Sequence, residues 1–268
     1  MKNLIGLRLS MSLCKLCQED RPLIRSHILP DAFNRDLRGD ASTPPLLISN
    51  NPNKHPRRLP GGHYDEDLVC LECEERFGPA DEYAARFFLD EFRNDGETFA
   101  VESTGEVLAF QYPDIDYRLL KMFAISLLWR ASVTSIQFFE RVTTGPHEER
   151  LRQIILGDDP GAADEFSTFI TRWVSRPGHE AMAQTQLSPY RAKLDGINEV
   201  KFLFAGATMH VKVDQRPYRE PFPALIIRPG SPLIVMAREL EGSKDILAVR
   251  RGLEAEAARQ QGRRNRRT

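Results

Sequence analysis

Apolar residues recur with the period of an α-helix in the middle of the chain. This period predicts three helices, over residues 82–92, 116–142 and 147–156. The apolar positions of the second helix cover too wide an arc for a helix at the surface. We therefore expect Phe123, Leu127 and Trp129 to be buried at the centre of the fold, and Arg130 can pair there with a buried carboxylate.

The hydrophobic period shortens toward two residues after this helical region, which is typical of half-buried strands. Five strands are predicted, over residues 165–174, 200–204, 209–213, 224–227 and 233–236. Gly and Pro residues separate them, as expected for turns. A run of helices followed by a run of strands indicates the α+β class, with a mostly antiparallel sheet in this part of the chain.

The first 80 residues differ from the rest because they contain few long apolar runs. Both cysteine pairs lie there, and residues 42–63 are rich in Pro, Asn, Gly and Arg and predict a long loop. A segment with so little core of its own depends on a metal for stability. We expect three parts: a zinc-binding module over 12–80, an α+β domain of unknown role over 81–248, and an Arg-rich basic tail over 249–268.

Charge and hydropathy restrict the environment of the protein. The formal net charge is −1, so any affinity for nucleic acid must come from local patches such as the tail or Lys54, Arg57 and Arg58. No apolar run reaches the length of a transmembrane helix, and the first residues lack a signal-peptide pattern. We expect a cytoplasmic protein that does not enter a membrane.

The strongest chemical signal is a doubled Cys-x-x-Cys pattern. Cys14 and Cys17 form one pair, and Cys70 and Cys73 form the other. Each pair offers two thiolates from one tight turn, and two pairs complete the tetrahedron that zinc prefers. A free or redox-active dithiol is the alternative, but a thioredoxin-like pair belongs to a parallel βαβ pattern, which this sequence lacks. The sequence therefore predicts one structural zinc ion.

Two short segments beside the cysteines point to a family. Ser26-His27-Ile28-Leu29-Pro30 follows the first pair, and Cys73-Glu74-Glu75-Arg76-Phe77 begins inside the second. From Cys14 to Phe77 the chain resembles the HNH endonuclease superfamily in its zinc-stabilised treble-clef form. The resemblance implies a knuckle, a β-hairpin and a helix (a ββα unit), and hydrolysis of DNA with a catalytic divalent metal.

The resemblance also implies roles for individual residues. His27 stands at the position of the general base that deprotonates the attacking water. Ser26 replaces an Asp or His metal ligand, Asp65 stands at the usual Asn position, and Glu74 replaces the closing His that binds the catalytic metal. Asp65 and Glu74 are oxygen ligands suited to Mg²⁺ or Mn²⁺. His63 is a further candidate ligand.

Two functions of different classes follow, and the sequence leaves both open. The first is an HNH-like nuclease, a hydrolase that cleaves DNA with a divalent metal and His27 as base. The alternative is a non-catalytic zinc module that binds nucleic acid or a protein partner, which accounts for Ser26 and for the missing closing His. A protein partner would bind through residues 113–240, and this is compatible with either function.

Overall fold

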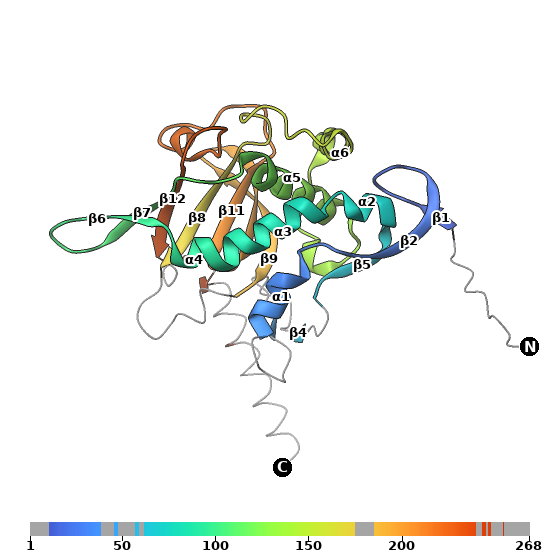
Figure 1. Ribbon diagram of the computed structural model, residues 1–268, viewed down its shortest axis with the longest axis horizontal. Helices are drawn as coiled ribbons and strands as arrows, with labels where there is room; N and C mark the ends of the chain where they lie inside the picture. The colour runs from blue at the N-terminus through green and yellow to red at the C-terminus, as the bar shows by residue number, and fades with distance from the viewer. Residues whose placement is uncertain are drawn as a thin grey trace, which may run out of the picture.

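The computed structural model describes residues 11–38, 46–47, 57–58, 62–174, 185–239, 243–244, 246–247 and 254. Its N-terminal part, at one end of the molecule in Figure 1, is an antiparallel sheet in the order β1-β2-β5 with two helices. These elements are β1 (Met11–Leu13), β2 (Asp20–His27), α1 (Asp31–Arg38), β5 (Tyr64–Cys70) and α2 (Leu71–Glu75). A separate two-stranded pair joins β3 (Leu46–Leu47) to β4 (Arg57–Arg58).

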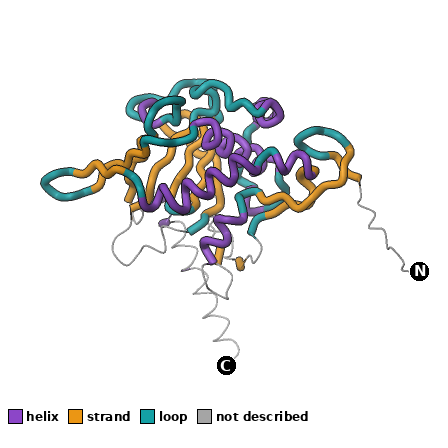
Figure 2. The backbone as a smooth tube through the Cα atoms, in the orientation of Figure 1, coloured by secondary structure: helices purple, strands orange, loops and turns teal. Residues whose placement is uncertain are grey.

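Helices follow, and Figure 2 shows them against one side of the larger sheet. They are α3 (Gly78–Arg86), a π-helical turn η1 (Phe87–Glu91), α4 (Phe92–Asn94), α5 (Tyr117–Val133) and α6 (Glu148–Gly157). Three short 3₁₀ turns are η2 (Gln137–Phe139), η3 (Gly145–His147) and η4 (Phe222–Leu225). The predicted helices over 82–92 and 147–156 are confirmed, and the first begins earlier than the sequence indicated.

The predicted helix over 116–142 is real but shorter. Asp116 caps its N-terminus, since its Oδ1 accepts a hydrogen bond from the Leu119 N–H at 2.9 Å. Helix α5 ends at Val133, and Thr134 is extended. The β-branched residues after position 132 disfavour further helix, so the apolar residues near 136–139 pack from a 3₁₀ turn instead.

The larger sheet has seven strands in the order β6-β7-β12-β8-β11-β10-β9. All neighbours are antiparallel except β12 and β8. The strands are β6 (Glu97–Ala100), β7 (Val107–Tyr112), β8 (Thr168–Val174), β9 (Leu187–Leu194), β10 (Ile197–Phe204), β11 (Ala207–Lys212) and β12 (Leu233–Glu239). This arrangement confirms the α+β class and the mostly antiparallel second part.

In the described part of the chain after residue 81, one predicted strand is wrong and three strands were missed. Residues 224–227 are not a strand: they lie at the 3₁₀ turn η4, where Pro221 and Pro223 remove ladder donors. Strands β6, β7 and β9 were not predicted. Strand β9 contains Pro189, which the sheet tolerates because β9 lies at its edge.

Helix α5 lies at the centre of the fold, where it packs against α3, α6 and β11. Phe123 and Leu127 are fully buried and Trp129 is 1% exposed, which confirms the expected burial. The same continuous core takes in Phe77 of the predicted N-terminal module and Val235 of β12. The boundary proposed near residue 80 therefore crosses a shared core.

No helix in the described part of the chain is long and apolar enough to cross a membrane. Most of the predicted loop over 42–63 and nearly all of the basic tail over 249–268 lie outside the described residues. Of the predicted basic cluster, Lys54 lies outside the described residues, and Arg57 and Arg58 are described only as the backbone of β4.

Candidate functional site

The two cysteine pairs meet in space. Cys14 and Cys17 lie in the turn between β1 and β2, Cys70 ends β5, and Cys73 lies in α2. Their four sulfur atoms all lie within 4.8 Å of one another, and none is in a disulfide. Among the residues that the structure describes, this is the one group of three or more His, Cys, Asp or Glu side chains so arranged. The cluster can hold a metal ion such as zinc, as predicted.

Backbone N–H groups lower the pKa of one thiol of the cluster, that of Cys14. Burial raises the pKa of Cys14, but N–H groups of Cys17, Cys70 and Leu16 oppose it and bring the pKa down to about 7. One of these is the Cys70 N–H, which donates to Cys14 Sγ at 3.4 Å. Because metals bind the thiolate, such N–H donors favour the form that coordinates.

The first knuckle is tied to the helices by two cationic side chains. Lys15 Nζ donates to the Val133 carbonyl at the end of α5 at 2.7 Å. Arg152 Nη1, from α6, donates to the Leu16 carbonyl at 2.6 Å. Charge-assisted bonds of this kind are the stronger class of hydrogen bond. Loss of the metal would therefore disturb the helical core as well as the knuckle.

The register of the β2–β5 hairpin sorts the predicted catalytic residues onto two faces. Ser26 lies opposite Asp65, and His27 lies opposite Tyr64. Since successive side chains of a strand point to opposite faces, Ser26 and Asp65 share the inner face while His27 and Tyr64 share the outer one. Burial agrees, because Ser26 is fully buried and the His27 side chain is 26% exposed.

Asp65 is held on that inner face by the end of α5. Its Oδ2 accepts hydrogen bonds from Thr134 Oγ1 at 2.6 Å and from the Ser135 N–H at 3.4 Å. Burial raises the pKa of Asp65, but these donors and the Asp67 N–H outweigh it, so the net pKa is lowered. The carboxylate therefore anchors the hairpin to α5 and is not brought together with the His27 imidazole.

Glu74 is a buried carboxylate on α2 whose pKa responds to the charge of the predicted base. Burial raises its pKa, and the Ser26 hydroxyl and the charges of Arg130 and His27 oppose that rise. The Ser26 hydroxyl is therefore close enough to the Glu74 carboxylate to lower its pKa. Ser26 Oγ and Glu74 Oε2 are both buried, and neither has a hydrogen-bond partner among the described residues. Buried polar atoms without a protein partner are commonly paired with a bound water, ion or ligand.

Arg130, on α5, contacts both the end of β2 and helix α3. Its guanidinium is fully buried and binds both carboxylate oxygens of Asp81, at 2.8 and 2.6 Å. Nη1 also donates to the His27 carbonyl at 2.9 Å. The expected pairing of Arg130 with a carboxylate is confirmed, and it fixes the end of β2 to α5 and α3. No pattern in the sequence identified Asp81 as the partner.

The imidazole of His63, the additional candidate ligand, packs in the core instead. It stacks on Phe138 with ring centroids 3.9 Å apart and meets Phe139 edge-on at 5.3 Å. The residue is 5% exposed, and burial lowers the pKa of its imidazole to about 4. These contacts indicate a structural role for His63.

His63 should make folding sensitive to mild acid. An unfolded histidine binds its proton near pH 6.5, well above the folded pKa of about 4. The unfolded state thus binds more protons in this window, and the free energy of unfolding should fall, by on the order of 3 kcal/mol, as the pH drops from 6.5 toward 4. Denaturant unfolding at several pH values measures this change.

The variant His63→Gln is the control for this prediction. It removes the titration but leaves the cysteines unchanged, so acid-induced metal loss affects both proteins alike. We expect a flatter pH dependence in the variant. Equal slopes in the two proteins would show that His63 does not contribute.

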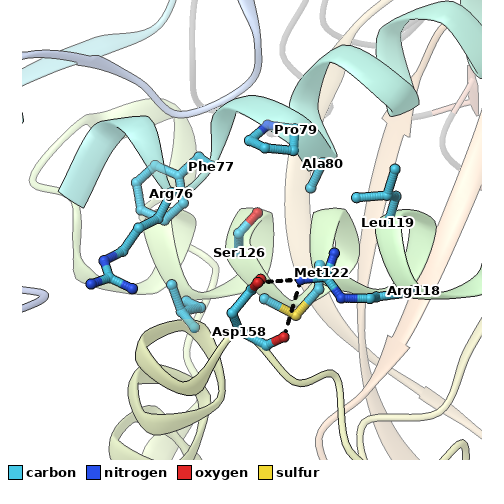
Figure 3. Close-up of a pocket in the computed structure, with 10 residues that line it drawn as sticks. Arg76, Phe77, Pro79, Ala80, Arg118, Leu119, Met122, Ser126 and Asp158 are labelled. Atoms are coloured by element: carbon cyan, nitrogen blue, oxygen red, sulfur yellow. Dashed lines mark hydrogen bonds and ion pairs between the residues drawn. The ribbon is translucent and has the colours of Figure 1, made fainter. Parts of the chain in front are cut away.

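A pocket of about 200 Å³ lies between α3, α5 and α6, away from these residues (Figure 3). Its floor is apolar, formed mainly by Phe77, Leu119 and Met122. At its edge Arg118 pairs with Asp158. None of His27, Asp65 and Glu74 lines it, so it is separate from the candidate site.

Comparison of the chain with protein-family models, with curated proteins and with solved structures finds no match. Binding of DNA, and of a protein partner through residues 113–240, stay predictions.

Proposed function

We propose that residues 12–80 form a zinc-stabilised, HNH-like treble-clef module that hydrolyses DNA with a second, divalent metal ion. One observation carries this proposal: Ser26 Oγ and Glu74 Oε2, buried oxygens without a hydrogen-bond partner in the described part of the chain, occupy the two positions where the family resemblance puts metal ligands. The charge of His27, at the position of the general base, acts on the Glu74 carboxylate.

The order of elements supports the treble-clef assignment. A cysteine knuckle leads into β2, β5 returns to the second pair, and α2 begins directly after Cys70. The resemblance implies this sequence of knuckle, hairpin and helix. Glu74 thus lies on the helix and His27 on the hairpin, the two elements that face each other across the site in a treble clef.

The donor set suits a hard cation. Mg²⁺ is commonly bound by one or two carboxylates, with water and substrate phosphates completing its coordination. Glu74 would supply the carboxylate and Ser26 a neutral oxygen. When bound there, the cation would neutralise charge that develops on the scissile phosphate.

Side chains of this module and of α5 would supply the proton transfer and the positioning that hydrolysis also needs. His27 is partly exposed and can accept the proton of the attacking water, the usual role of a histidine base. Its Nε2 lies 3.9 Å from Asp31 Oδ1, so this carboxylate can stabilise the imidazolium that forms. Arg130 holds the His27 backbone in place through its carbonyl.

A non-catalytic zinc module is the second candidate, and a different observation favours it. Asp65 is committed to Thr134, and the four cysteines are the one convergent set of three or more candidate ligands in the described part of the chain. Such a module would need its zinc and a binding surface, without a second metal.

Incubating the zinc-loaded full chain with supercoiled plasmid separates the two candidates. The nuclease proposal expects nicking that requires added Mg²⁺ or Mn²⁺. Binding of DNA without nicking under either metal, in protein with a filled zinc site, would favour the non-catalytic module.

A further inference from the structure

A second pocket, with a volume of about 410 Å³, lies where the start of α6 meets the loop before β8 and the loop after β11. Its lining is rich in charged side chains and includes Arg150, Asp164, Glu165, Lys212 and Asp214. No residue of the cysteine cluster or of the candidate nuclease site lines it. A ligand held there therefore belongs to a separate site.

Two buried ammonium groups lie at this pocket without an ion pair. Lys212, at the end of β11, is 4% exposed, and its Nζ donates to the Arg216 carbonyl at 3.1 Å. Lys121, on α5, is fully buried, and its Nζ donates to the carbonyls of Glu165 and Phe166 at 2.8 and 2.5 Å. Within the described residues, neither ammonium lies within 4.0 Å of a carboxylate oxygen. A buried cation without a counter-ion is costly, so both groups favour an anionic ligand.

The titration of these amines agrees with that cost. Burial lowers the pKa of Lys212, and it lowers the pKa of Lys121 to about 7. The positive charge of Lys212 lowers the pKa of Lys121 further. A carboxylate bound beside Lys212 would stabilise the charged form of both amines.

Asp164 supplies an opposite charge in the same lining. Its side chain is exposed and forms no hydrogen bond or ion pair within the described residues. Its negative charge opposes the lowering of the Lys212 pKa, although the two groups are not in contact. The other two carboxylates of the lining are already paired with arginine side chains. Asp164 is thus the lining carboxylate that can accept a cationic group.

The backbone in the wall of this pocket is strained. Phe166 has a φ of +46°, in the left-handed region that bulky side chains rarely adopt. In this conformation its carbonyl accepts hydrogen bonds from Lys121 Nζ and from Thr168 Oγ1, at 2.5 and 3.0 Å. Strained backbone of this kind concentrates at active sites and ligand-binding sites.

We propose that this pocket binds a small neutral zwitterion such as a free α-amino acid, with its carboxylate on Lys212 and its ammonium group on Asp164. The ligand carboxylate would be the missing counter-ion, and its hydrogen bond to Lys212 would be charge-assisted. The volume lies in the usual range of small-molecule sites. A phosphate dianion fits less well, because three carboxylates line the pocket and repel its second charge. The site does not depend on the proposed nuclease function.

Titration of the full chain with L-leucine and two analogues, followed by ligand-observed NMR, tests this proposal. Isocaproate keeps the carboxylate and apolar body of leucine but lacks the ammonium group. Isoamylamine keeps the ammonium group but lacks the carboxylate. We expect leucine to bind at least about tenfold more tightly than either analogue, because each analogue loses one charge-assisted hydrogen bond.

Variants assign each contact to its side chain. Lys212→Met should weaken leucine binding about tenfold or more and should not weaken isoamylamine binding. Its fold should persist, because the change removes an unpaired buried charge. Asp164→Asn should weaken leucine binding without weakening isocaproate binding. Lys193→Met and Asp114→Asn, at exposed positions outside the pocket, are the matched controls and should bind leucine as the wild type does. Thermal unfolding verifies that each variant is folded.

Three results would overturn the proposal. The first is leucine binding of equal strength in Lys212→Met and the wild type. The second is isocaproate binding as tight as that of leucine, which would assign a simple anion site. The third is the absence of leucine binding to the folded wild-type chain.

Discussion

Replacing Cys70 with Ser should lower the zinc content from about one equivalent to less than half, and should destabilise the fold by about 4 kcal/mol or more. Loss of a structural metal is among the few single changes with effects this large. The four sulfurs converge within 4.8 Å, and Lys15 and Arg152 tie the first knuckle to α5 and α6. The free energy of metal binding therefore stabilises more than the knuckle itself.

Elemental analysis and denaturant unfolding measure the two effects together. His27→Ala is the control, since it changes a residue of the same hairpin that lies outside the sulfur cluster, and it should keep its zinc. Wild-type protein with reduced thiols and well under half an equivalent of zinc would contradict the metal assignment.

Replacing His27 with Ala should slow DNA cleavage by 10²–10⁴-fold, the usual effect of removing a general base. The imidazole is 26% exposed and lies 3.9 Å from Asp31, and the backbone carbonyl of His27 is held by Arg130. Truncation should leave these backbone contacts intact. The rate loss should therefore come without loss of zinc or of DNA affinity.

The matched control for that experiment is His147→Ala. His147 packs against Phe166, with ring centroids 5.8 Å apart, at the start of α6. It should cleave at the wild-type rate. Equal cleavage rates in His27→Ala and the wild type would remove His27 from the mechanism.

Hydrophobic periodicity predicted the elements that face the core on a regular period. Helix α5 and strands β8, β10, β11 and β12 were found in this way, because burial selects apolar residues at fixed spacing. Strand β6 was not predicted because all four of its residues are exposed, so no buried face imposes a hydrophobic pattern on its sequence. Strand pairing, which the sequence does not encode locally, is what holds it in the sheet.

In the site too, features set by residues adjacent in sequence were predicted, whereas features set by residues far apart in sequence were not. Two Cys-x-x-Cys pairs sufficed to predict the sulfur cluster, since each pair is a local turn. The position of Asp65 could not be predicted, because the extra residues in β5 set its register and Thr134, far along the chain, holds its carboxylate. The pairing of Arg130 with Asp81 likewise joins two helices and leaves no pattern in either one.

Binding of Mn²⁺ to the zinc-loaded chain tests the central claim most directly, because the claim is that Ser26 and Glu74 mark a second metal site. Electron paramagnetic resonance measures free Mn²⁺ and so counts the bound ions. We expect one bound Mn²⁺ per chain in the wild type, and binding weakened at least tenfold in Glu74→Gln at unchanged zinc content. No bound Mn²⁺ in the wild type, or equal binding in the two proteins, would contradict it.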